Sequence, residues 1–345
     1  MSPRRSPADR APNQNDVARL AGVSAQTVSR VMSGQSNVRP ETARRVLSAV
    51  EELDYRVHAA AASLASGRTR ILGVIVLSTN RYSTAALGVG IERVAAENGY
   101  TVTTASVSDH APIEEIEAAF DLLERQGAEG IVLGVPVSLD HPGMRARTER
   151  TPSTRNVRVS ADEDAAFAVD QTRVARLAVE HLLDLGHETV WHVSGDEYWT
   201  ESVQRRETWE QVLREHGIEP PPVLPADWTS ESGYRAGRTL AAIPGATAVF
   251  VSSDEMAFGV MRALHEAGRS VPDDVSIVSV DDIALAAYAS PALTTVRQPF
   301  EEVGAAAARR VIAQIEGEAP VGEIPRVEPE LILRASTAPP NLHQD

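Results

Sequence analysis

From residue 71 onward, short apolar runs alternate with amphipathic stretches along the chain. Six of these runs predict β-strands, at residues 71–77, 101–107, 130–135, 190–195, 248–253 and 275–282. The stretches between them carry apolar residues at helical spacing, and several end in glycine, the residue expected where a helix stops. Regular alternation of strand and helix predicts parallel sheets covered by helices, and this many strands favours two Rossmann-like sheets over one.

The first 55 residues show helical spacing instead. In residues 15–34, NDVARLAGVSAQTVSRVMSG, Gly22 allows a tight turn because glycine adopts a positive φ without a Cβ clash. Ser24 is placed to cap the second helix. A third helix is predicted from Pro40 to Leu53, with proline at the first position, where its missing N–H is harmless. The positions predicted to form the shared core are Val17, Ala18, Ala21, Val23, Val28, Val31, Val46, Val50 and Leu53.

The second of these helices is predicted to present Ala25, Gln26, Ser29 and Arg30 to the outside. Such a helix suits readout in the major groove of DNA, since Gln can pair with adenine and Arg with guanine. An ordinary helical hairpin with a solvated polar face is the alternative interpretation. The turn glycine, the capping serine and the outward Gln and Arg coincide at the expected spacings, which favours a helix-turn-helix.

Charge is divided unevenly along the chain, whose formal net charge is −15. Residues 1–70 hold 11 arginines against six acidic residues, whereas the remainder holds 22 arginines against 42 acidic residues. A basic head on an acidic body suits a DNA-binding protein whose second part must not bind phosphate itself. The chain has no cysteine, which excludes a disulfide framework, a thiol nucleophile and a thiolate metal site.

Residues 1–13 are rich in Arg, Pro, Ser and Asn and lack an apolar segment, so a disordered arm is expected there and not a signal peptide. No apolar run approaches the length that spans a bilayer. We therefore expect a soluble cytoplasmic protein without membrane contact.

The segment DVARLAGVSAQTVSRVMSGQSNVRPETARRVLSAVEELDY resembles the DNA-binding headpiece of the lactose-repressor (LacI/GalR) family of bacterial transcription regulators. The resemblance implies base readout by Gln26 and Arg30 and an apolar base contact by Ala25. It also implies contacts, mainly to phosphates, by three hydroxyl side chains, those of Ser24, Thr27 and Ser29.

Residues 58–70 form an Ala-rich stretch with good helix propensity that is too short to be stable alone. In the family, the equivalent segment is a hinge helix that folds on operator DNA and wedges a leucine into the minor groove. Leu64 holds that position here, and His58 stands where the family has an Asn that contacts DNA. A plain linker with one buried leucine is the alternative.

The body of the chain resembles the same family in VEHLLDLGH, SSDEMAFGVMRAL, VPDDVSIVSVDD and SPALTTVRQP. The implied fold is that of a periplasmic sugar-binding protein, an α/β core of two Rossmann-like lobes joined by three crossovers. The expected lobes comprise residues 71–168 with 299–326, and 169–298 with 327–337. The full predicted division is a disordered arm (1–13), a helix-turn-helix headpiece (14–57), a hinge and linker (58–70), a two-lobed effector-binding and dimerisation domain (71–337) and a tail (338–345). No leucine heptad follows, so a dimer is expected.

A sugar site needs an aromatic face for the ring and charged planar groups for the hydroxyls, at the carboxyl ends of strands. The resemblance implies that Trp228 stacks on the sugar, that Arg205 clamps hydroxyl groups and that Asp281 binds the ligand. For Trp228 a structural packing role is the alternative. The Asp-Trp pair at 227–228 favours a galactoside.

Five more residues complete the predicted ligand site: Tyr82, Trp199, Glu201, Ser253 and Gln298. Tyr82 can equally lie on the surface, and Gln298 can bridge the lobes instead of touching ligand. Ser253 replaces a family Asn, which removes one amide contact. Two neighbouring charges receive other assignments, because Asp254 is expected to cap a helix and Arg206 to be solvated.

These features predict a dimeric repressor of sugar-utilisation genes that binds a palindromic operator and responds to a small sugar. A purine or phosphorylated metabolite as effector is the alternative, followed by a sugar-processing enzyme with a regulatory head. The chain has no G-x-S-x-G elbow, P-loop or G-x-G-x-x-G motif, so no enzyme activity and no cofactor is expected. His181 and His187 flank a helix end, where a solvated or capping histidine is expected in place of a metal ligand.

Overall fold

A computed structural model describes residues 12–32, 38–55, 63, 67–78, 81–135, 155–158, 169–318 and 328–341. The chain divides into two compact units, residues 1–69 and 70–345. His58 and Leu64, both predicted to contact DNA, lie outside the described residues.

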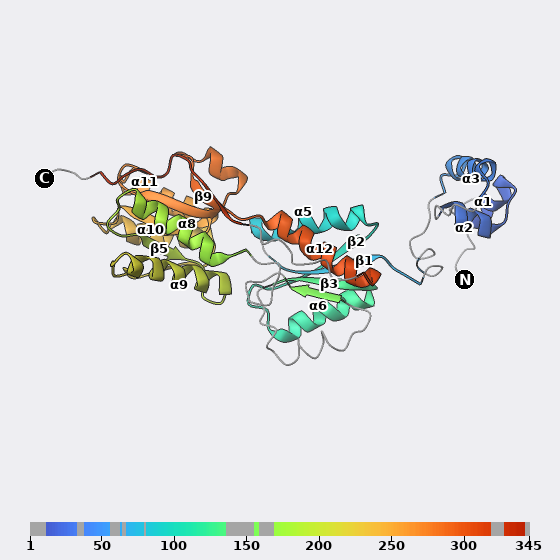
Figure 1. Cartoon of the computed structure of the whole chain (residues 1–345), viewed down its shortest axis with the longest axis horizontal. Coiled ribbons are helices and arrows are strands. Elements are labelled where there is room, and N and C mark those ends of the chain that lie inside the picture. The colour runs from blue at the N-terminus through green and yellow to red at the C-terminus, as the bar shows by residue number, and fades with distance from the viewer. Residues whose placement is uncertain are drawn as a thin grey trace, which may run out of the picture. The chain divides into compact units, whose positions relative to one another are not determined.

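The N-terminal unit contains three helices around a small apolar core (Figure 1). These are α1 (Gln14–Ala21), α2 (Ala25–Met32) and α3 (Pro40–Glu52). Asn13 and Asp16 form a reciprocal capping box at the start of α1, and Gly22 ends that helix with φ of 65°. The core predicted from the sequence is confirmed, since Val17, Val28 and Val46 are fully buried.

The second unit begins with a four-stranded parallel sheet in the order β2-β1-β3-β4. Its strands are β1 (Ile71–Leu77), β2 (Thr101–Val107), β3 (Ala128–Gly134) and β4 (Arg155–Arg158). The helices of this lobe are α5 (Tyr82–Glu97), α6 (Ile113–Arg125) and α12 (Phe300–Glu316). Helix α12 comes from the far end of the chain and packs directly on α5.

The contact between α5 and α12 depends on two glycines. A Cβ at Gly90 would lie 1.9 Å from the carbonyl oxygen of Glu301, and a Cβ at Gly304 would lie 2.2 Å from that of Leu87. Only glycine permits backbones to approach so closely. Since α5 begins at Tyr82 and α12 at Phe300, this contact also fixes the positions of those two residues.

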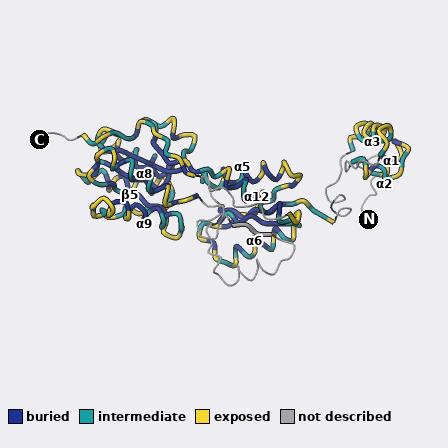
Figure 2. The backbone as a smooth tube through the Cα atoms, viewed as in Figure 1, coloured by how far each residue is buried: buried dark blue, intermediate teal, exposed yellow. Residues whose placement is uncertain are grey.

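The other lobe contains a six-stranded sheet in the order β10-β9-β8-β7-β5-β6, in which only β10 is antiparallel to its neighbour. Its strands are β5 (Trp191–Ser194), β6 (Leu224–Pro225), β7 (Ala248–Val251), β8 (Ser276–Asp281), β9 (Thr294–Arg297) and β10 (Glu330–Ile332). Its helices are α8 (Gln171–Asp184), α9 (Thr200–Glu215), α10 (Ser230–Ala241) and α11 (Asp254–Glu266), with a 3₁₀ turn at Ala284–Tyr288. Strands β7 and β8 at the centre of this sheet are buried throughout, and Figure 2 shows buried backbone inside this lobe with more exposed residues around it.

The predicted fold class is confirmed: a helical headpiece precedes an α/β core with one parallel sheet and a second sheet that is parallel except for β10. Strands 71–77 and 101–107 have the predicted bounds. The other four predicted runs overlap β3, β5, β7 and β8, which differ from them by one or two residues at one or both ends. Four strands were not predicted: β4, β6, β9 and β10.

The C-terminal residues extend the second lobe further than expected. The N–H of Ala338 donates to Ser276 Oγ at 3.0 Å, and the Ala338 carbonyl accepts from Nε2 of His187 at 3.0 Å. His187 is 4% exposed, so the expectation of a solvated or capping histidine is wrong. Residues 338–341 therefore pack on the lobe, although a separate tail was predicted from 338.

Candidate functional site

The outer face of α2 is the candidate DNA-binding surface. Gln26, Ser29 and Arg30 are exposed. Ser24 Oγ accepts a hydrogen bond from the Thr27 N–H at 3.2 Å, so Ser24 caps this helix as predicted. Ala25 differs from the prediction, because it is half-buried against the core and its carbonyl accepts from Gln14 Nε2 at 2.7 Å. That bond joins the start of α1 to the start of α2.

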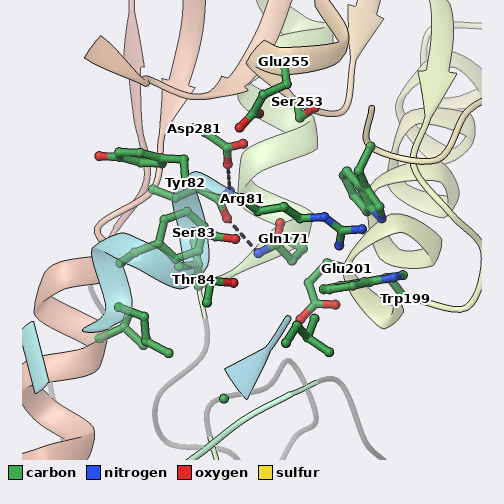
Figure 3. A pocket seen from close by; sticks show the side chains of 18 of the residues that line it. Arg81, Tyr82, Ser83, Thr84, Gln171, Trp199, Glu201, Ser253, Glu255 and Asp281 are labelled. Atoms are coloured by element: carbon green, nitrogen blue, oxygen red, sulfur yellow. Dashed lines mark hydrogen bonds between the residues drawn. The ribbon is translucent and has the colours of Figure 1, made fainter. Parts of the chain in front are cut away.

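One cavity in the second unit lies between the two lobes and has a volume of about 140 Å³ (Figure 3). All eight residues predicted for ligand binding line it: Tyr82, Trp199, Glu201, Arg205, Trp228, Ser253, Asp281 and Gln298. Most stand at the start of a helix or the end of a strand, as expected for a site at the carboxyl ends of parallel strands. This volume is well above the roughly 10–15 Å³ that a single water needs, so the cavity has room for a small polar ligand in place of several waters.

Arg205 is the centre of a buried polar network in this cavity. Its Nε donates to Gln171 Oε1 at 2.8 Å, and its Nη1 donates to the Ser252 carbonyl at 2.5 Å. Gln171 Nε2 donates to Gln298 Oε1 at 2.9 Å, and Gln298 Nε2 donates to Asp281 Oδ1 at 2.6 Å. The bonds of Gln298 thus join residues of one lobe and do not bridge the two lobes, while Gln298 lines the cavity.

In this network, burial and the neighbouring opposite charge shift each pKa in opposite directions. Burial lowers the pKa of Arg205, and the nearby negative charges of Asp281 and Glu201 raise it. Burial raises the pKa of Asp281 well above its usual value, while the positive charge of Arg205 lowers it. A desolvated cation and carboxyl group held by amides suit directional hydrogen bonds to a neutral polyhydroxyl ligand.

Asp281 has an unusual backbone, with φ of 113°, and the next residue, Asp282, has φ of 58°. Asp282 is held by two ion pairs, with Arg297 at 2.7 Å and with Arg334 at 2.5 Å. These bonds come from β9 and from the segment after β10. They stabilise the turn that places the Asp281 carboxyl group in the cavity.

Ser253 lines the cavity as predicted, but it also takes the capping role that was predicted for Asp254. The Ser253 side chain accepts from the Met256 N–H and caps α11, so the expectation that Asp254 is the cap is wrong. Asp254 is fully buried and accepts hydrogen bonds from the Ser279 hydroxyl, Thr295 Oγ1 and the Ile283 N–H. Burial raises the pKa of Asp254 to about 6, although these hydrogen bonds oppose the shift.

Aromatic residues also line the cavity, beside the polar network around Arg205. The rings of Trp199 and Trp228 meet edge to face with centroids 5.9 Å apart, and Tyr82 contacts Phe300 in the same way at 6.4 Å. Tyr82 therefore lines the pocket, which the sequence left open. Trp228 has φ of 72°, and its indole lies against Gly195, where a Cβ would be 2.2 Å from the ring.

Some cavity residues were not predicted, among them Arg81, Ser83, Thr84, Gln171, Glu255 and Phe300. Arg81 directly precedes the predicted site residue Tyr82, and this adjacency is the signal in the sequence that could have identified it. Arg206 pairs with Glu197 at 2.5 Å and does not line the cavity.

Within the described residues, no group of three or more His, Asp or Glu side chains is arranged to hold a metal ion. None of the described helices is long and apolar enough to cross a membrane.

A helix-turn-helix in one unit and a polar, aromatic-walled pocket between two lobes in the other define a DNA-binding regulator that responds to a small molecule. Comparison with known proteins identifies the family. Residues 14–58 match the profile of bacterial regulatory proteins, lacI family, and residues 179–337 match the periplasmic binding protein-like domain. The chain belongs to the lacI family of transcription regulators.

Similarity to individual members extends over nearly the whole chain. Catabolite control protein A of Priestia megaterium is 31% identical over 326 residues, covering 93% of this chain and 98% of that protein. The regulator AscG of Escherichia coli is 33% identical over 309 residues, covering 88% and 91%. The lac repressor dimer bound to operator and an anti-inducer superposes with a TM-score of 0.85 at 28% identity, covering 95% and 100%. A complex of the regulator CelR with cellobiose gives 0.68 at 28% identity, covering 94% and 99%.

Proposed function

We propose that this regulator represses sugar-utilisation genes, and that a small sugar in the cavity between the lobes changes its affinity for operator DNA. The observation that carries the proposal is the composition of that cavity. Two tryptophans supply apolar ring faces, and the network of Arg205, Gln171, Gln298 and Asp281 supplies fixed donors and acceptors for hydroxyl groups. A galactoside is the proposed sugar, from the Asp-Trp pair at 227–228.

On the DNA side, we propose that the exposed face of α2 enters the major groove. Arg30 and Gln26 read base edges, Ala25 adds an apolar contact, and Ser24, Thr27 and Ser29 bind mainly phosphates. His58 and Leu64 are proposed DNA contacts in the hinge. Two subunits would read the two halves of a palindrome, as the lac repressor dimer on its operator suggests.

We also propose that the protein is a cytoplasmic binding protein and not an enzyme. Its relatives named above are transcription regulators, one of which was solved with cellobiose. In incubations with chromogenic glycosides, no chromophore should be released. Release of the chromophore would contradict this part of the proposal.

A thermal-shift panel with galactosides, glucosides, pentoses and purines tests the proposed ligand class. A ligand at 100 times its Kd adds about 2.7 kcal/mol to the free energy of unfolding, which is readily detected. Selective stabilisation by a sugar, together with a change in operator affinity, is the expected result. Stabilisation by a purine alone would overturn the sugar assignment. Equal affinity for galactosides and glucosides would overturn the galactoside.

A further inference from the structure

Arg81 reaches from one lobe into the aromatic wall of the other. It stands directly before α5, whereas Trp199 precedes α9 and Trp228 precedes α10. The Arg81 Cζ atom lies 4.3 Å from the ring centroid of Trp199 and 5.7 Å from that of Trp228. Figure 3 shows the Arg81 guanidinium extending toward Trp199. The protein's own cation thus occupies the notch between the two indoles.

Charges around the notch hold the guanidinium there. Arg81 Nη2 pairs with Asp109 Oδ2 at 2.8 Å, and the Arg81 side chain is 21% exposed. Burial lowers the pKa of Arg81, while the negative charges of Asp109, Asp196, Glu255 and Asp227 raise it. Stacking on indole adds a cation–π attraction that strengthens as water is excluded.

The two indoles offer little other surface to a ligand. Gly195 lies so close to Trp228 that a Cβ there would be 2.2 Å from the ring, and Arg205 Cζ lies 5.6 Å from the same ring centroid. The edge of one indole faces the other. Approach from the cavity remains, and Arg81 lines the cavity at this point.

We propose that Arg81 is a built-in competitor for the place of the ligand ring, and so determines which ligands the pocket accepts. This inference rests on the proposed function, in which a sugar ring stacks on Trp228. A ring has to displace the guanidinium, so only ligands whose stacking and hydroxyl bonds outweigh that contact bind. Because Arg81 and the tryptophans belong to different lobes, entry of such a ring also removes a contact between the lobes.

The direction of the change in affinity tests the proposal. Tryptophan fluorescence titrations with methyl β-D-galactopyranoside and methyl β-D-glucopyranoside are carried out on the native protein and on Arg81→Ala. Loss of a cation–π contact is expected to lower the Kd of a bound glycoside by about 3- to 30-fold. Arg206→Ala is the matched control, because Arg206 also pairs with a carboxylate but lies outside the cavity lining, and its Kd should not change.

A second variant keeps Arg81 but removes its ion-pair partner. Asp109→Asn removes the ion pair at 2.8 Å, and its Kd is expected between those of the native protein and Arg81→Ala. This variant carries the test if Arg81→Ala does not fold.

Each other outcome overturns the inference. Weaker glycoside binding by both variants would show that Arg81 contacts the ligand. An unchanged Kd would show that Arg81 does not affect binding. Either result leaves the sugar proposal intact. If neither glycoside binds the native protein or the variants at millimolar concentration, both this inference and the proposed sugar site are wrong.

Discussion

The substitution Gly90→Ala, which adds one methyl group, tests the packing of α5 on α12 that positions Tyr82 and Phe300 in the cavity lining. The added Cβ would lie 1.9 Å from the Glu301 carbonyl oxygen and 2.8 Å from the Ala305 backbone nitrogen. Both are backbone atoms, so no side-chain rotation relieves the clash. Helices α5 and α12 have to separate by more than about 1 Å before these atoms reach van der Waals distance.

The magnitude follows from two opposing effects. Overpacking a core costs about 1–3 kcal/mol, and a clash with backbone belongs at the upper end of that range. Replacing a glycine inside a helix by alanine contributes about 0.5–1 kcal/mol in the other direction. Gly90→Ala should therefore lower the free energy of unfolding by about 2 kcal/mol, or the apparent Tm by about 4–8 °C for a unit of this size.

Gly88 supplies a matched control on the same helix, because a Cβ there meets nothing within 4 Å. Gly88→Ala should gain the helix contribution without the clash and melt slightly above the native protein. Thermal denaturation followed by circular dichroism compares the three proteins. If Gly90→Ala melted as high as Gly88→Ala, the close approach of α5 and α12 would be refuted.

Three further outcomes are expected. Arg30→Ala should cost about 1–3 kcal/mol of binding to the cognate operator and leave non-specific binding nearly unchanged in a mobility-shift titration, whereas equal losses would assign Arg30 to phosphates. Asp254 has a pKa of about 6 when folded against 3.8 ordinarily, so its contribution to stability is fully present below pH 3.8 and is lost as the pH rises through 6. In urea denaturation the native protein should therefore lose about 3 kcal/mol relative to Asp254→Asn across that interval, and parallel pH profiles would contradict the shift. Tyr288 is 84% exposed on the turn after β8, next to Leu285 at 64%, so Tyr288→Asp should weaken the proposed dimer in sedimentation experiments, and unchanged dimerisation would place the interface elsewhere.

The sequence predicts a strand well where apolar residues are continuous. Strand β1, ILGVIVL, has the expected bounds for this reason. Strand β9, TTVR, was missed because its first two residues are polar, yet Thr294 and Thr295 are fully buried. Their hydrogen-bonding partners include Ser336 and Asp254, which are distant in the sequence. A pattern of apolar residues cannot predict the burial of polar residues whose hydrogen-bonding partners are distant in the sequence.

Some residues of the candidate site could be predicted from the sequence around them, and others could not. Asp281 and Ser253 were identified from the family resemblance, and both follow buried strands, whose ends gather at one edge of a parallel sheet. The stacking of Arg81 on Trp199 could not be predicted, since it joins residues from different lobes. Serine and aspartate are both good helix caps, so only the structure shows that Ser253 caps α11 while Asp254 is buried.

The contribution of α12 to the first lobe has a consequence for synthesis of the chain on the ribosome. About 200 residues separate the end of α5 from the start of α12. At about 5–20 residues per second, translating them takes roughly 10–40 s. During that interval Leu87 and Ile91 on α5 lack the helix that later packs beside them. The lobe that is translated first therefore stays incomplete while most of the other lobe is made, and its nascent form exposes an apolar surface of the kind that chaperones recognise.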